Sequence, residues 1–186
     1  MTRGEKIERL LAVVQGELAK RIREDDGNNR DRAREIAKYW VGSWIPDGFD
    51  RRLAYCAVGA VWCCRGAGFD MPPATGCNYL AQWASHGGWS RCRAQLLPAG
   101  TRPQPGDLFL LDTGAPGVFN HIGFVLHAGA THFVSGEANT SPDATSNDAR
   151  GALAGFWSRS RAIASTSGII RLEPDPDPAA VAGVAP

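Results

Sequence analysis

The sequence predicts a single α+β domain in which N-terminal helices pack on an antiparallel β-sheet. Apolar residues recur at helical spacing in the first half of the chain and alternate with a period of two from about residue 107 onward. The length of 186 residues suits one domain with one sizeable core. Because the helical segments come first and the strand segments follow, the helices are expected to pack together on the sheet.

Four helices are predicted, and they cover residues 6–22, 30–40, 54–65 and 78–86. The first has one apolar stripe, formed by Ile7, Leu10, Leu11, Val14, Leu18 and Ile22. Its polar face mixes acidic with basic side chains, which favours a helix packed on the core over one that lies on a membrane. Gly66 and Gly68 end the third helix, and Trp83 is expected on the buried side of the fourth. Residues 1–45 then form the helical N-terminal part of the domain.

Five strands are predicted after the helices, and they cover residues 107–111, 121–127, 132–136, 154–159 and 168–172. A loop over residues 98–105 separates them from the helices. The last segment, residues 173–186, is rich in Pro, Asp and Ala and has too few apolar side chains to build a core, so it is expected to be disordered. The folded domain is therefore expected to span residues 1–172.

The composition excludes several classes of function. A net charge of +1, from 20 basic and 19 acidic side chains, does not suit a nucleic-acid-binding protein. No apolar run approaches the length of a membrane span, and the charged N-terminus does not resemble a secretory signal. We therefore expect a monomer that is synthesised in the cytoplasm and needs a separate release step to reach any target outside the cell. Five cysteines, an odd number without a C-x-x-C pair, indicate neither a disulfide framework nor a zinc ribbon.

Cys56 is the candidate nucleophile because it lies in the first turn of the third predicted helix. The helix dipole and the free N–H groups there stabilise a thiolate, which is the attacking form of cysteine. A lone cysteine is more often a small buried apolar residue, and that interpretation suits Cys63 and Cys64, which lie deep in the same helix. Cys77 and Cys92 show no pattern that indicates a partner.

His121 is the candidate base because it opens a predicted strand directly after a loop rich in glycine and proline. A hairpin with the strand that begins at His132 would place His121 opposite residue 138 or 139. Glu137 and Asn139, two residues apart, would then project to one face, where either could accept the imidazole N–H. This depends on the register, and polar residues at strand ends are ordinarily solvated.

Four segments in this order resemble those of CHAP domains, which are cysteine- and histidine-dependent amidohydrolases/peptidases with a papain-like α+β fold. They are Tyr55-Cys56-Ala57-Val58, Pro105-Gly106-Asp107-Leu108, His121-Ile122-Gly123-Phe124-Val125 and Gly136-Glu137-Ala138-Asn139-Thr140. The resemblance spans roughly residues 5–172. Each segment alone is a weak signal, and the specificity comes from finding all four in the right order. Two positions depart from the family pattern, Ala138 where Gly is commoner and Tyr55 where Trp is frequent.

The resemblance implies that Cys56, His121, Glu137 and Asn139 are catalytic, and that no cofactor or metal is needed. The Ala138 departure leaves open whether Glu137 or Asn139 contacts the ring. The implied substrate is bacterial peptidoglycan, cut at an amide bond between muramic acid and the stem peptide or within the peptide. The implied reaction is acyl transfer through a thioester, with the backbone N–H of Cys56 as one oxyanion donor.

Three biological roles fit this interpretation. A phage endolysin fits best, since the chain is compact, lacks a signal sequence and shows no repeat typical of a wall-binding module. A secreted antibacterial effector or a wall-remodelling enzyme would use the same chemistry. A non-catalytic wall-binding module with the same fold is the alternative from another class.

Overall fold

The computed structural model describes residues 1–22, 35–40, 54–112, 117–141 and 154–172. The α-helices α1 (Arg3–Ala19), α3 (Cys56–Gly66) and α4 (Cys77–Ser85) lie in these ranges, and residues 35–37 are also α-helical. Two short 3-10 helices cover Lys38–Trp40 and Ile163–Ser165. The strands are β1 (Gly88–Trp89), β2 (Cys92–Pro98), β3 (Leu108–Asp112), β4 (Phe119–Ala128), β5 (His132–Thr140), β6 (Gly155–Ala162) and β7 (Gly168–Leu172).

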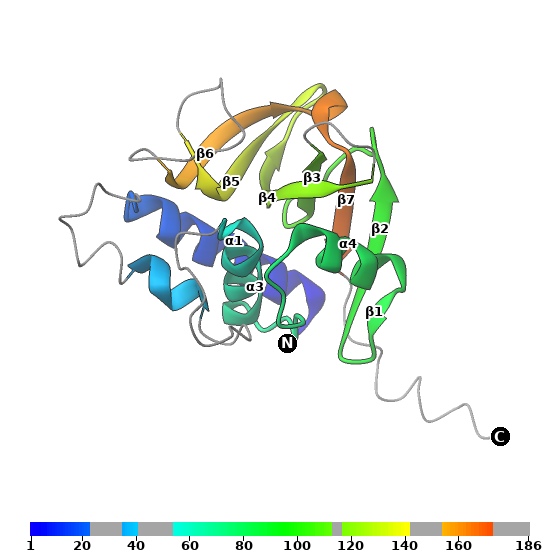
Figure 1. Ribbon diagram of the computed structural model, residues 1–186, viewed down its shortest axis with the longest axis horizontal. Helices are drawn as coiled ribbons and strands as arrows, with labels where there is room; N and C mark the ends of the chain where they lie inside the picture. The colour runs from blue at the N-terminus through cyan, green and yellow to red at the C-terminus, as the bar shows by residue number, and fades with distance from the viewer. Residues whose placement is uncertain (23–34, 41–53, 113–116, 142–153, 173–186) are drawn as a thin grey trace.

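The strands form one sheet in the order β1-β2-β7-β3-β4-β5-β6, and every neighbouring pair is antiparallel. The predicted α+β class, with helices on an antiparallel sheet, is confirmed. The three helices pack against the sheet, with α1 on β5 and β6, α3 on β4 and β5, and α4 on β2 and β4 (Figure 1). Helix α3 therefore lies against β4 and β5, the strands that carry the candidate base and its predicted partners.

Side-chain alternation along the strands divides the core in two. Ile122 and Phe124 of β4 join the cluster that includes the helices, whereas Val125 joins a smaller cluster with Phe109 and Phe133. His121 and Gly123 alternate with Ile122 and Phe124 along β4, so they share the face of Val125. The candidate base thus lies on the sheet face of the smaller cluster, near the ring of Phe109.

Element boundaries differ from the prediction in several places, and β6 in particular runs to Ala162, beyond the predicted end at residue 159. α1 covers residues 3–19 instead of 6–22, because a capping box between Thr2 and Glu5 starts it earlier. Strands β1 and β2 were not predicted, and β2 is held by pairing with β7 at the far end of the chain. Strand β5 runs on to Thr140, beyond the predicted end at residue 136.

Two predictions fall largely outside the described residues. Of the predicted helix 30–40, only residues 35–40 are described; residues 35–37 are α-helical, as predicted, and Lys38–Trp40 is a 3-10 turn. The predicted disordered tail, residues 173–186, lies outside as well. Within the described ranges, no helix has both the length and the apolar character that crossing a membrane requires.

Candidate active site

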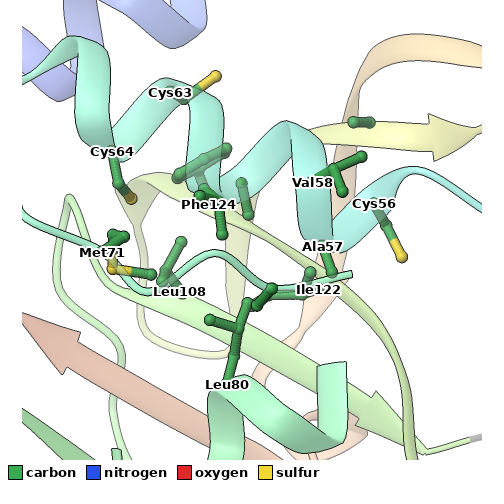
Figure 2. Close-up of a cluster of buried hydrophobic side chains, with 14 of the residues drawn as sticks. Cys56, Ala57, Val58, Cys63, Cys64, Met71, Leu80, Leu108, Ile122 and Phe124 are labelled. Carbon is green, nitrogen blue, oxygen red and sulfur yellow. The ribbon is translucent and has the colours of Figure 1, made fainter. Parts of the chain in front are cut away.

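Cys56 is the first residue of α3 and is 3% exposed. Figure 2 shows its thiol projecting from the first turn of the helix, away from Phe124 and Leu108. The preceding residue, Tyr55, makes no side-chain hydrogen bond that caps the helix, so the first-turn N–H groups are not occupied by a capping side chain. The sulfur lies 3.8 Å from the carbonyl oxygen of Asn120, the residue before the candidate base.

A close contact between helix and strand fixes where Cys56 lies. A Cβ atom added to Gly59, one turn along α3, would meet the Cβ of Ala138 on β5 at 2.7 Å. Only glycine therefore allows α3 to approach β5 this closely. The thiol of Cys56, in the first turn of this helix, interacts with the imidazole of His121, and this interaction lowers the pKa of the thiol and raises that of the ring.

His121 is 2% exposed, and its Nε2–H donates to Glu137 Oε2 at 2.8 Å. Since Glu137 occupies Nε2, the other ring nitrogen, Nδ1, is left for the thiol of Cys56. Gly123 lies beside this pair, and a Cβ there would meet Glu137 Cγ at 2.8 Å and the Phe109 ring at 2.7 Å. The glycine in the His121-Ile122-Gly123 segment thus makes room for the carboxylate.

Glu137 and Asn139 differ in what they contact. Glu137 makes the hydrogen bond to His121, whereas Asn139, among the described residues, makes none to the ring. Asn139 has a φ of 57° and sits where the β5–β6 register shifts between Ala138 and Thr140. The prediction that the two side chains share a face assumed a regular strand, and this bulge interrupts the alternation.

Arg161 and Ser135 complete the surroundings of Glu137, and sequence reasoning missed both. Arg161 Nε donates to Glu137 Oε1 at 2.8 Å and its NH2 group donates to Oε2 at 2.6 Å. The Ser135 hydroxyl donates to Oε1 as well. Arg159 and Arg161 are both about nine-tenths buried, on alternate positions of β6. Buried arginines need a carboxylate partner, so two arginines on the inner face of one strand are a signal for a buried acidic side chain. This signal was missed because the predicted strand ended at residue 159 and did not include Arg161.

Cys77 also escaped the sequence analysis. It is the first residue of α4, is 5% exposed, and its sulfur lies 3.7 Å from the sulfur of Cys56. By contrast, Cys63 and Cys64 are fully buried, and burial raises the pKa of both thiols. They are the inert core cysteines that the sequence indicated.

The pKa values at the site favour a charged pair. The pKa of the Cys56 thiol is held well below its usual range by hydrogen bonds from Cys77 and His121, against the effect of burial. Burial acts to lower the pKa of His121, but hydrogen bonds to Cys56 and Glu137 outweigh it and raise that pKa to about 9. Burial acts to raise the pKa of Glu137, and hydrogen bonds from Arg161 and His121 outweigh it, bringing that pKa to about 2.

Near neutral pH these values correspond to a chain of alternating charges. Its members are the thiolate of Cys56, the imidazolium of His121, the carboxylate of Glu137 and the guanidinium of Arg161. Each buried charge has an opposite neighbour, which is the condition under which charges are tolerated in an interior. A thiolate at a helix start, next to an imidazolium, can attack a carbonyl carbon and deliver a proton to the leaving group.

A groove of about 360 Å³ lies between α4 and the strands β2 and β4, and its lining does not include Cys56, His121 or Glu137. Its lining includes Asn78, which follows Cys77 in the chain, and Phe119, two residues before His121. The Asn78 side chain accepts a hydrogen bond from the Phe119 N–H at 2.7 Å and so joins α4 to β4. In the part of the chain that the structure describes, no three His, Cys, Asp or Glu side chains are grouped as metal ligands.

Comparison with known proteins gives one positive finding. The model of the CHAP domain family matches residues 46–139, about half of the chain, and this segment contains Cys56, His121, Glu137 and Asn139. No curated protein matches the chain.

Proposed function

This chain belongs to the CHAP domain family, a family of peptidoglycan amidases and peptidases with a papain-like fold, and we propose that it hydrolyses an amide bond of peptidoglycan with Cys56 as nucleophile and His121 as acid and base. The supporting observation is the buried, hydrogen-bonded chain from Cys56 through His121 to Glu137. These residues come from three different elements, α3, β4 and β5.

In the first half of the proposed reaction, the Cys56 thiolate attacks the amide carbonyl carbon. The His121 imidazolium then gives its proton to the departing amine as the C–N bond breaks and a thioester remains. Glu137 stays ionised, holds the ring so that Nδ1 faces the sulfur, and stabilises the imidazolium. In the second half, neutral His121 takes a proton from water, which attacks the thioester and releases Cys56.

The oxyanion of each tetrahedral intermediate needs donors that are already in position. We propose the backbone N–H of Cys56 as one donor, because no capping side chain occupies the start of α3. A donor of this kind contributes about 3 kcal/mol to the transition state. The stem peptide would lie in the groove lined by Asn78 and Phe119, since Asn78 follows Cys77 in the chain and Phe119 begins β4, two residues before His121.

The biological role that we propose is that of a phage-type lysin, as the sequence resemblance favours. A secreted antibacterial effector or a wall-remodelling enzyme would carry out the same reaction. The genes next to this one separate the roles, because a holin gene supports the lysin and a gene for an immunity protein supports the effector.

The proposed reaction is tested by incubating the purified chain with peptidoglycan and identifying the released fragments by mass spectrometry. We expect fragments with new amino and carboxyl ends at one type of amide bond, and their masses identify that bond. Cys56→Ala is expected to release none while its thermal transition stays close to that of the wild type. Cys63→Ala, which removes a fully buried thiol from the same helix, is the matched control and should retain activity.

Two outcomes would contradict the proposal. An active Cys56→Ala variant would exclude the thiol mechanism. Wild-type protein that sediments with peptidoglycan but releases no fragments would instead indicate a non-catalytic wall-binding module.

A further inference from the structure

Two helices begin at the same pair of sulfur atoms. Cys56 is the first residue of α3 and Cys77 is the first residue of α4, and their sulfurs are 3.7 Å apart. Neither helix has a side-chain cap, since neither Tyr55 nor Gly76 makes a capping hydrogen bond. The positive ends of both helix dipoles therefore act on one small, buried volume. The reaction proposed above assigns no role to Cys77.

We propose that Cys77 is a positioning residue, whose thiol donates a hydrogen bond to the Cys56 thiolate and holds that sulfur ready for attack. The catalytic meaning of this inference rests on the proposed function. The hydrogen bond itself does not, because it concerns the ionisation of Cys56 in the absence of substrate.

The direction of the hydrogen bond follows from the charges around the two sulfurs. Two thiols this close cannot both ionise at little cost, so the pair keeps one proton between them. Cys56 has the imidazole of His121 as a hydrogen-bond partner, with Glu137 and Arg161 behind that ring. The backbone N–H of Ala57 also bonds to the Cys56 sulfur. Cys56 is therefore the sulfur that ionises and Cys77 the one that keeps its proton, in line with the raised pKa of Cys77.

This hydrogen bond would affect catalysis in two ways: it would raise the fraction of Cys56 that is ionised, and it would fix the position of the Cys56 sulfur. A donor on the side of α4 holds the sulfur between that helix and the imidazole of β4. It also stabilises the charged form, so that a thiolate is available at lower pH. A purely structural Cys77 would contribute packing only, and its removal would change stability without changing the ionisation of Cys56.

The test compares Cys77→Ala, which removes the donor, with Cys77→Ser, which keeps an O–H donor at the same place. The rate at which iodoacetamide alkylates Cys56 is measured against pH by peptide mapping under reducing conditions, and no substrate is present. We expect the apparent pKa of Cys56 to rise by about one unit in Cys77→Ala, equivalent to a tenfold lower thiolate fraction on the acid side. Cys77→Ser should restore most of the wild-type value.

Two controls accompany the measurement. Cys64→Ala removes another fully buried thiol and should leave the titration of Cys56 unchanged. If Cys77→Ala does not fold, Cys77→Val fills the site with another side chain that lacks a donor. In active protein, the acid limb of the kcat/KM profile should move by the same amount as the alkylation pKa.

The inference fails if Cys56 titrates in Cys77→Ala or Cys77→Val as it does in the wild type, or if Cys77→Ser behaves like Cys77→Ala. A protein that releases no peptidoglycan fragments but shows the shift would contradict the proposed function and leave this inference standing. A protein that releases peptidoglycan fragments but shows no shift in the pKa of Cys56 would support the proposed function and contradict this inference.

Discussion

At the scale of residues, Glu137 connects the candidate site to the sheet. It has no exposed surface and accepts hydrogen bonds from His121 of β4, Ser135 of its own strand and Arg161 of β6. A buried carboxylate is stable only while these donors remain, and they in turn depend on its charge. The side chain that orients the candidate base is therefore also important for the stability of the fold.

This dual role predicts how acid affects the protein. The pKa of Glu137 is lowered from 4.5 to about 2, so its contribution to the free energy of unfolding is complete above pH 4.5 and is lost as the pH falls through about 2. The contribution is on the order of 3 kcal/mol. We expect Glu137→Gln to be less stable than the wild type above pH 4.5, and the difference to shrink towards pH 2. Denaturant titrations at several pH values measure it.

Glu17→Gln is the matched control for Glu137→Gln. Glu17 is 3% exposed and is also held by basic partners and a hydroxyl, from Lys20, Lys38 and Tyr39. None of these partners belongs to the candidate site. Both variants should lose stability, but only Glu137→Gln should also lose at least tenfold in the rate of fragment release. Equal rates in the two variants would show that Glu137 has no orienting role.

Site residues could be predicted from the sequence only where a local pattern, such as the start of a helix or strand, indicates them. Cys56 was predicted from its place at a helix start and His121 from its place at a strand start, and the hairpin register offered Glu137 and Asn139 as alternatives without deciding between them. Arg161 and Cys77 could not be predicted in this way. Arg161 reaches Glu137 through the register that pairs Glu137 with Trp157, and Cys77 reaches Cys56 through the packing of two helices on the sheet.

At the scale of elements, the contact between α3 and β5 determines how the thiol meets the imidazole. Gly59 lies against Ala138 with no room for a side chain. Ala138 is flanked by Glu137 and Asn139, so a displacement of α3 from β5 would also disturb the strand that carries the ring's partner. Ala138 stands where the family pattern more often has Gly, and its side chain fits here because the residue that faces it, Gly59, has none.

Substitution of Gly59 should therefore be more harmful than substitution of a glycine in an open place. We expect Gly59→Ala to lower the free energy of unfolding by about 1–3 kcal/mol, because the new methyl group meets a Cβ that the backbone holds in place. It should also slow fragment release by moving Cys56 relative to His121. Gly16→Ala is the control, since a Cβ on this exposed residue of α1 meets nothing within 4 Å. It should stabilise the protein by about 0.5–1 kcal/mol.

Chemical denaturation and activity assays of both variants check this prediction. Gly59→Ala with wild-type stability and activity would show that α3 and β5 can separate without consequence for the site.

The strands with clear alternation were predicted within a few residues, and the exceptions have physical reasons. Strand β2 pairs with β7, which lies about 70 residues further along the chain, and no local pattern reveals that pairing. The bulge at Asn139 depends on how β5 and β6 pair. The start of α1, by contrast, was predictable, because Thr2 and Glu5 have the spacing of a capping box.

At the scale of the whole molecule, the α+β arrangement brings together residues from five separate elements of the chain. Helices α3 and α4 supply the two sulfurs, β4 supplies the imidazole, and β5 and β6 supply the buried ion pair behind it. The helices pack on the sheet (Figure 1), and α3 and α4 begin close together, with the sulfurs of Cys56 and Cys77 3.7 Å apart. The alternating charges of Cys56, His121, Glu137 and Arg161 are coupled. Removal of one of these side chains should therefore change the ionisation of its neighbour.

The protonation state of His121 tests this account most directly, and ¹⁵N NMR of the histidine-labelled protein measures it against pH. We expect the His121 ring to stay doubly protonated at about pH 7 and to lose its proton near pH 9, because Cys56 and Glu137 both stabilise the imidazolium. The stability that this charge adds is complete below the ordinary pKa of 6.5 and is lost as the pH rises through about 9. In Cys56→Ser the proton should be lost at a lower pH. A wild-type ring that is already neutral at about pH 7 would contradict the proposed thiolate–imidazolium pair.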